Sequence, residues 1–492
     1  MDAEQADLAP KVKRALTWST INNLLLRVGN FGVGILLARL LAPEEFGVYA
    51  VALTVQTVVQ AFSELGLSSD LIRNGRIRER AGTTTTLATG SNALLAASMI
   101  IFAGPIASVL GSHQATPVVQ VMSLTLVIAG LSVVPYAWIQ REFRQTAQLF
   151  FDGSSLVVST VLTVVLVKLG FGAMALAISR VVAQALVCVM QYAYTKMRLR
   201  FGYNREVARS LLKFGLPLAS ANLLSWIVLN VDYMVVGARG GAVMLGFYVL
   251  AFNISSWPMT ALGQAVRSVA LPGFSQLGDP ARKAEGFTAA AALTWAVALL
   301  AGVLLSTLAT TVVPLLYGAK WSLSAQALAG LGFFGALRVV FDLTATFLIA
   351  VGATRSVLYV QAIWVVVLAP AMIVGIDHWG LAGAGWSHVV VCVVCVLPAY
   401  LVLLPRHGVR LGRLLLDLLV PAVAAVPAIV VGTLIAEAIS IPILALAAGG
   451  AASSVVYLAP LLLWLRTRLR ILKNSSTGPV SEETVVAAVS GV

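Results

Sequence analysis

The sequence predicts an all-α polytopic membrane protein with about 14 transmembrane helices, forming two pseudo-symmetric six-helix lobes and two extra C-terminal helices. Three observations predict this class: the apolar composition, the recurring apolar runs, and the uneven distribution of Lys and Arg among the loops. Of the 492 residues, 59% are hydrophobic and only 11% are charged, whereas soluble domains have about 25% charged residues. A string of soluble domains is therefore excluded.

Apolar runs of about 20 residues recur along the whole chain, and each is long enough to cross a hydrocarbon core of about 30 Å. The predicted spans are 16–38, 46–66, 86–110, 116–138, 154–170, 173–195, 213–237, 245–270, 287–316, 323–350, 355–375, 378–404, 414–436 and 441–465. Residues 1–15 are polar and lack an apolar signal region, so we expect no cleaved signal peptide. The small, polar C-terminal tail is expected to be disordered.

The basic residues follow the positive-inside rule. With both termini cytoplasmic, the cytoplasmic segments hold 26 Lys and Arg, the outer loops hold 4, and 3 lie within spans. Such an asymmetry across short loops is a strong topology signal, because one missed or extra helix would invert every later loop. The net charge of +13 is therefore explained by topology rather than by nucleic-acid binding. Heavy use of Ala, Val, Gly and Arg is a weak sign of a GC-rich bacterial genome. The expected location is the bacterial inner membrane, which the chain crosses many times with both termini in the cytoplasm.

An internal repeat relates two segments of the chain, 37–52 and 236–251. At an offset of 199 residues, glycine, tyrosine and alanine recur, with Gly47 on Gly246 and Tyr49 on Tyr248. An even number of spans separates the segments, which predicts a parallel repeat with a substrate path between the two halves. The predicted parts are an N-terminal cytoplasmic segment 1–15, an N-lobe 16–200, a C-lobe 201–405, two further helices in 406–465, and a cytoplasmic tail 466–492.

Polar residues recur at helical spacing on the first two spans of each predicted lobe, so each set lies on one face of its helix. Arg27 falls near the middle of the first span, where a charge costs about 2.5–3.5 kcal/mol and needs either a wet cavity or a buried partner. Both alternatives stay open. Together with one arginine of the span 323–350, these stripes supply the candidate substrate-binding residues: Arg27, Asn23, Asn30, Gln56, Gln60, Asn222, Asn253, Trp257, Gln264, Arg267 and Arg338.

Acidic residues within or beside the spans are candidates for ion coupling, because a transporter driven by an ion gradient needs a titratable group. The candidates are Asp232, Asp342 and Glu64. Arg338 and Asp342 are four residues apart on one helix face, which favours either an intrahelical ion pair that lowers the insertion cost or a coupling site. His388 is interpreted as a hydrogen-bonded core residue rather than a proton relay.

Three segments, 37–50, 64–74 and 230–253, resemble the polysaccharide-transporter family, which includes the Wzx-type lipid-linked oligosaccharide flippases. This family belongs to the multidrug/oligosaccharidyl-lipid/polysaccharide exporter superfamily, and the resemblance covers residues 14–465. It implies two lobes around a central cavity and alternating access. The implied cargo is a polyprenyl-pyrophosphate-linked glycan, flipped to the outer leaflet for lipopolysaccharide or exopolysaccharide. The planar fork of an arginine such as Arg27 suits a pyrophosphate.

The sequence contains no G-x-x-x-x-G-K-[ST], H-E-x-x-H or G-x-S-x-G pattern, and its loops are too short for a catalytic domain. We therefore predict a protein that is not an enzyme, with no catalytic residue, no cofactor and no metal. The expected partners are the lipid-linked oligosaccharide, membrane lipids, and glycan polymerase or glycosyltransferases, with no nucleic acid. The alternatives are a multidrug exporter or a lipid II flippase of the same superfamily, and, from another class, a non-transporting scaffold for glycan enzymes.

Overall fold

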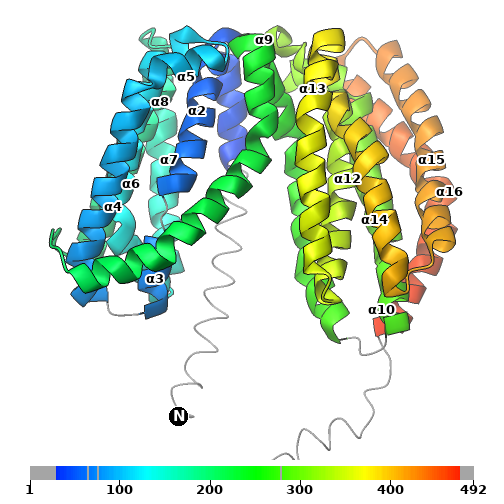
Figure 1. Cartoon of the computed structure of the whole chain (residues 1–492). Coiled ribbons are helices and arrows are strands. Elements are labelled where there is room, and N and C mark those ends of the chain that lie inside the picture. The colour runs from blue at the N-terminus through cyan, green and yellow to red at the C-terminus, as the bar shows by residue number, and fades with distance from the viewer. Residues whose placement is uncertain (1–28, 64–65, 75–76, 277–279, 477–492) are drawn as a thin grey trace, which may run out of the picture. The chain divides into compact units, whose positions relative to one another are not determined.

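The computed structural model describes residues 29–63, 66–74, 77–276 and 280–476, all of whose regular elements are helices (Figure 1). The chain divides into two compact units, Met1–Phe247 and Tyr248–Val492. After an initial helix, Gly29–Leu40, the α-helices are α2 (Pro43–Ser63), α3 (Leu67–Asn74), α4 (Ile77–Ile101), α5 (Ala103–Val109), α6 (Thr116–Arg141), α7 (Gln145–Lys168), α8 (Ala173–Thr195), α9 (Arg205–Gln276), α10 (Pro280–Thr307), α11 (Ala309–Tyr317), α12 (Ser324–Ala350), α13 (Thr354–Val391), α14 (Leu397–Leu403), α15 (Leu411–Ala438) and α16 (Pro442–Ser476). Short 3₁₀ or π turns are η1 (His113–Ala115), η2 (Ala319–Trp321), η3 (Cys392–Val396) and η4 (Leu404–His407).

Every predicted span coincides with a helix, although the first is described only from residue 29 onward. Within the described part of the chain, nine helical segments are long and apolar enough to cross a membrane, and α4 with α5 forms a further span bent by 63°. One of the nine segments, Thr354–His407, contains two predicted spans, and another, Asn230–Gln264, overlaps two. The chain breaks inside them at Gly241 (φ 75°) and Gly380 (φ 57°), a backbone region that glycine enters without steric cost. The predicted fold class is confirmed.

The structure differs from the predicted spans mainly at helix ends. The short helix α3 follows the second span, where the sequence predicted a loop. Its residues are too few and too polar to stand out as a span, but Asp70 near its start and Arg73 in its last turn match the helix dipole. Helix α7 begins nine residues before the predicted start at 154, because a helix continues beyond the apolar stretch that marks its membrane crossing.

In the first unit, α6 packs against α2, α3, α4 and α8. Gly130 of α6 lets the helix approach α4 closely, since a Cβ atom there would lie 2.8 Å from the carbonyl oxygen of Ala88. At the α3 end of this unit, the buried Asp70 carboxylate forms an ion pair with Arg80 at 2.8 Å, and Arg80 also donates a hydrogen bond to Ser210 of α9 at 3.1 Å. A charged network thus joins α3, α4 and the start of α9.

The two glycines paired by the internal repeat contact each other's segments in the first unit. A Cβ atom on Gly47 would overlap the backbone carbonyl of Ala242. A Cβ atom on Gly246 would lie 2.8 Å from the carbonyl oxygen of Pro43 and 3.0 Å from the nitrogen of Gly47. The repeat offset of 199 relates Pro43 to Ala242 just as it relates the two glycines. The contact is therefore reciprocal between repeat-related positions.

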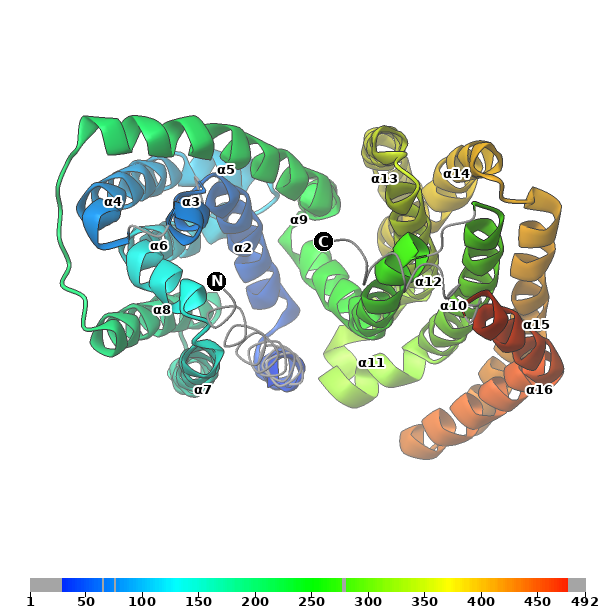
Figure 2. The ribbon, with the colours of Figure 1, turned by 90° about the horizontal axis from the view of Figure 1, so that it is seen from below.

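In the second unit, α10 packs against α12, α15 and α16, and α12 packs against α13 (Figure 2). Leu299, Val303, Ala428 and Tyr457 form a buried cluster between α10, α15 and α16. The Tyr457 hydroxyl donates to the carbonyl oxygen of Ala296 at 2.8 Å, so this buried polar group is satisfied within the core. The two compact units meet between Phe247 and Tyr248 and are defined by packing. The lobes predicted from the internal repeat meet between residues 200 and 201, and that boundary stays a prediction.

Candidate functional site

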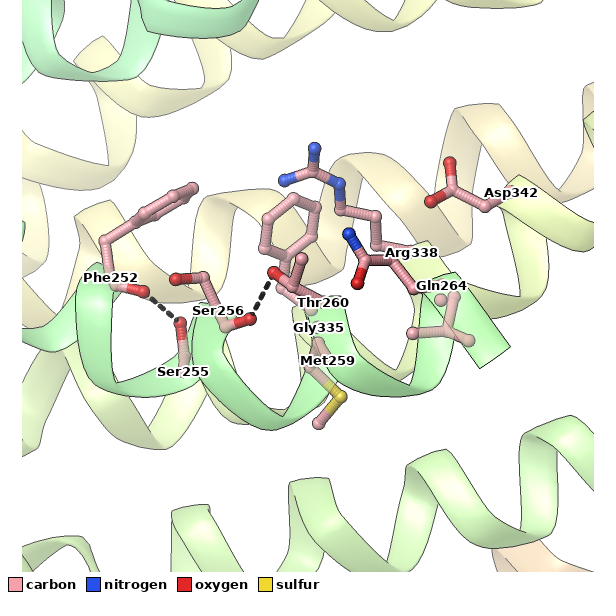
Figure 3. A pocket seen from close by; sticks show the side chains of 12 residues that line it. Phe252, Ser255, Ser256, Met259, Thr260, Gln264, Gly335, Arg338 and Asp342 are labelled. Carbon is pink, nitrogen blue, oxygen red and sulfur yellow. Dashed lines mark hydrogen bonds between the residues drawn. The ribbon is translucent and has the colours of Figure 1, made fainter. Parts of the chain in front are cut away.

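A cavity of about 130 Å³ lies in the second unit between α9 and α12 (Figure 3). Both helices belong to apolar segments long enough to cross a membrane. Charged groups at this depth cost free energy, so a polar cavity here is a candidate functional site. Its lining residues are Phe252, Ser255, Ser256, Met259, Thr260, Gly263 and Gln264 from α9, and Phe334, Gly335, Arg338, Val339 and Asp342 from α12.

Small residues bring the two helices together at the cavity. A Cβ atom on Gly335 would lie 2.5 Å from Cγ of Met259, and one on Gly263 would lie 3.9 Å from a carboxylate oxygen of Asp342. A glycine at a contact position, such as Gly335, lets a neighbouring helix approach closely in a membrane. The close approach places the polar side chains of α9 and α12 around one small space.

The hydroxyl groups of α9 are oriented by their own helix. Ser255 donates to the carbonyl oxygen of Phe252 at 3.0 Å and Thr260 to that of Ser256 at 2.6 Å (Figure 3). Ser256 donates to the carbonyl oxygen of Asn253 at 3.1 Å. A hydroxyl whose proton is used in this way keeps its lone pairs for a donor from a bound molecule. This wall of the cavity can therefore accept hydrogen bonds.

The opposite wall carries both signs of charge on one helix. Arg338 and Asp342 are half-buried and extend from the same side of α12, with the Gln264 amide beside them (Figure 3). The guanidinium offers five N–H donors in a planar fork, which matches phosphate or carboxylate oxygens. The site can therefore bind an anionic group next to a group rich in hydroxyls.

Behind Arg338 lies a buried aromatic and polar layer. His388, 2% exposed, shares a 2.8 Å hydrogen bond between its Nε2 and the hydroxyl of Tyr248, and its ring contacts that of Phe334 in a tilted arrangement with the ring centroids 4.4 Å apart. The prediction that His388 is a hydrogen-bonded core residue is confirmed.

Replacing Tyr248 by phenylalanine is expected to lower the free energy of unfolding by about 1 kcal/mol, because His388 loses its hydrogen-bond partner inside the core. The change should appear as a lower melting temperature of the purified protein in detergent. The matched control is Tyr359→Phe, since Tyr359 is 67% exposed. Equal shifts for both variants would contradict the role given to the Tyr248 hydroxyl.

The predicted site residues of the first unit are not gathered into this cavity. Gln56 is buried and donates to the Thr125 hydroxyl of α6 at 2.6 Å, which is a helix-packing contact. Gln60 is half-buried, and Asn30 is exposed. Asp232 is 3% exposed.

The remaining predicted residues lie elsewhere or outside the described part of the chain. Asn222 is half-buried on α9, and Asn253 and Trp257 are exposed on α9 one turn from lining residues of the cavity. Asn23, Arg27 and Glu64 lie outside the residues that the structure describes, as does the side chain of Arg267. Their roles stay predictions.

Several residues that line the α9–α12 cavity were not predicted from the sequence. Ser255 and Ser256 lie one turn from the polar stripe that includes Gln264, and two adjacent serines in an apolar span were a usable signal. Phe334 and Met259 were indistinguishable from core residues. Only the pairing of α9 with α12 brings them to the same space.

The fold and the cavity define a helical membrane protein with a polar, charge-lined interior, the class of membrane transporters. The family described as polysaccharide biosynthesis protein matches residues 36–326, more than half of the chain. The chain belongs to this family. The resemblance inferred from the sequence is thereby confirmed.

Curated relatives are similar over much of the chain. The succinoglycan biosynthesis transport protein ExoT of Rhizobium meliloti (strain 1021) is 28% identical over 65% of this chain, and the match spans 62% of ExoT. The lipopolysaccharide biosynthesis protein WzxC of Escherichia coli (strain K12) is 22% identical over 86% of this chain and 87% of WzxC. The teichuronic acid biosynthesis protein TuaB of Bacillus subtilis (strain 168) is 21% identical over 79% of this chain and 81% of TuaB.

Two solved structures show the same fold. The lipid II flippase MurJ in an inward closed conformation has a TM-score of 0.68 at 15% identity, covering 91% of this chain and all of that one. An inward-facing multidrug resistance transporter of the MATE family and the MOP superfamily has a TM-score of 0.59 at 18% identity, covering 80% of this chain and 98% of that one. These likenesses concern the fold, and the multi-pass membrane architecture is confirmed.

Proposed function

We propose that this protein moves a polyprenyl-pyrophosphate-linked oligosaccharide from the cytoplasmic to the outer leaflet of the bacterial inner membrane, for surface polysaccharide biosynthesis. The observation that carries the proposal is the α9–α12 cavity, where a guanidinium, a carboxylate, an amide and three hydroxyls line one space in a membrane-spanning unit. The relatives named for succinoglycan transport, lipopolysaccharide and teichuronic acid support a glycan cargo.

The side chains suit the two chemical parts of such a cargo. Arg338 can donate two parallel, charge-assisted hydrogen bonds to phosphate oxygens. Gln264 and the hydroxyls of Ser255, Ser256 and Thr260 can exchange hydrogen bonds with sugar hydroxyls. Arg27, on the first predicted span, is proposed as a second phosphate ligand.

Alternating access follows from the proposed duplication, with lobes 16–200 and 201–405 rocking about a substrate path near the membrane midplane. Asp342 is the proposed coupling group, because it shares the cavity with Arg338. Binding of a proton or a cation at Asp342 would leave the charge of Arg338 free to hold an anionic cargo. Asp232 and Glu64 are the other proposed coupling residues, and both termini are proposed to be cytoplasmic.

The second candidate is a lipid II flippase, which the fold likeness to MurJ favours. Lipid II also carries a pyrophosphate and sugars, so the cavity alone does not separate the two cargoes. The lipid-linked substrate, a glycan polymerase and glycosyltransferases are the proposed partners.

Deletion of the gene, with complementation by the intact protein, tests the proposal. Lipid-linked repeat units should accumulate in the cytoplasmic leaflet and surface polysaccharide should fall, while growth and peptidoglycan remain normal. Arrested growth with accumulated peptidoglycan precursors would assign the lipid II function instead. Unchanged surface glycan with increased drug sensitivity would assign a multidrug exporter.

A further inference from the structure

A second polar pocket, of about 100 Å³, lies in the second unit where one end of α10, the start of α15 and the end of α16 meet. Arg410, Arg413 and Arg468 line it, together with Glu285. It shares no lining residue with the α9–α12 cavity. Its volume admits about three water molecules, which is also enough for one phosphate group.

The arginines of this pocket are only partly neutralised. Arg468 pairs with Asp417, whose side chain is 3% exposed. Arg413 lies 3.8 Å from Glu285, a long contact between two exposed side chains that contributes little. Arg410 forms no ion pair with any residue that the structure describes. Three guanidinium groups thus face two carboxylates, which leaves net positive charge at the pocket.

Unused hydrogen-bond donors point to the same conclusion. The buried Nε of Arg468 has no acceptor in the described part of the chain. Helix α15 starts beside the pocket at Leu411, and its N-cap residue, Arg410, makes no side-chain hydrogen bond to the first turn. The open N-terminus of a 28-residue helix carries free N–H groups and a positive partial charge, both of which favour an anion.

The pocket lies at the ends of membrane-spanning helices rather than within them. Trp464 is 5.8 Å from the Arg468 guanidinium, and tryptophan near a helix end marks the headgroup level of a bilayer. From this level the outer faces of α15 and α16 present exposed apolar residues, such as Leu416 at 64% and Leu463 at 75% exposure. An acyl chain could lie along these faces while its headgroup occupies the pocket.

We propose that this pocket binds the phosphate group of an anionic membrane phospholipid. Basic pockets between transmembrane helices bind lipid headgroups in this way. The chemistry that is recognised is a phosphate bearing net negative charge, held by Arg410, Arg413 and the start of α15. The site is independent of the cargo proposed for the α9–α12 cavity.

The test measures lipid binding to the purified full-length protein by native mass spectrometry, with phosphatidylglycerol and phosphatidylcholine as probes. The wild-type protein should retain phosphatidylglycerol in preference to phosphatidylcholine, whose choline neutralises its phosphate. The double variant Arg410→Gln/Arg413→Gln should bind phosphatidylglycerol about thirtyfold more weakly, at roughly 1 kcal/mol for each of the two arginines near the surface.

The matched control is Arg466→Gln/Arg470→Gln, which removes the same charge from exposed residues near the same end of α16 that do not line the pocket. This control should change phosphatidylglycerol binding less than about twofold, since only the general surface charge is altered. Equal losses in the two double variants would overturn the proposal. Full displacement of phosphatidylglycerol by equimolar inorganic phosphate would assign the pocket to free phosphate and overturn the lipid assignment.

Discussion

Replacing Arg338 by alanine is expected to reduce surface polysaccharide about tenfold or more in a complemented deletion strain. A charge-assisted hydrogen bond to a buried group contributes about 1.5–3 kcal/mol, and Arg338 supplies the guanidinium of the α9–α12 cavity. Arg338→Lys should retain part of the activity, because it keeps the charge but loses the bidentate fork. Surface polysaccharide would be measured by immunoblot or by sugar analysis, normalised to the amount of folded protein in the membrane.

The double variant Arg338→Ala/Asp342→Asn separates two explanations of this loss. If the two residues serve only as an ion pair that lowers the cost of insertion, removing both charges should restore export. If Arg338 binds the anionic cargo, the double variant should remain inactive. Arg355→Ala is the control, since Arg355 is exposed at the start of α13. Full export by Arg338→Ala at normal protein levels would contradict the cavity assignment and favour the scaffold function.

Replacing Gly47 by alanine is expected to destabilise the protein by about 3 kcal/mol. The added methyl group would overlap the backbone carbonyl of Ala242, and a backbone cannot move aside as a flexible side chain can. The helices would have to separate, with loss of the packing on both sides of the contact. The yield of monodisperse protein after detergent extraction and its melting temperature should both fall.

Gly90→Ala is the matched control for this substitution. Gly90 is also a helical glycine in the first unit, but a Cβ atom there would meet nothing within 4 Å. Alanine exceeds glycine in helix propensity by about 1 kcal/mol, so this variant should be at least as stable as the wild type. A similar melting temperature for both alanine variants would show that the Gly47 contact is not tight.

Most of the fold could be predicted from the sequence, because bilayer thickness fixes the length of a span and Arg and Lys mark its ends. Helix α3 could not be predicted, because its eight residues are too few and too mixed in polarity to form the long apolar run that marks a membrane span. The two spans of α9 were predicted separately, and the structure places the break between them at Gly241 (φ 75°).

The candidate site was only partly predictable. Spacing within each helix selected Gln264 on α9 and Arg338 and Asp342 on α12. The structure brings these three residues together in one cavity. The same reasoning selected Gln56, which instead bonds to Thr125 within the first unit. A polar stripe has the same period whether it faces a cavity or a neighbouring helix, so only helix pairing distinguishes the two.

The reciprocal contact between Gly47 and Gly246 has a consequence for the internal repeat of the chain. In a two-fold symmetric dimer, residue i of one subunit contacts residue j of the other, and j contacts i in return. Gly47 with Ala242 and Gly246 with Pro43 meet this condition within one polypeptide. The same pattern is expected if the chain contains the internal repeat that the sequence predicts, since repeat-related positions then take the places of i and j.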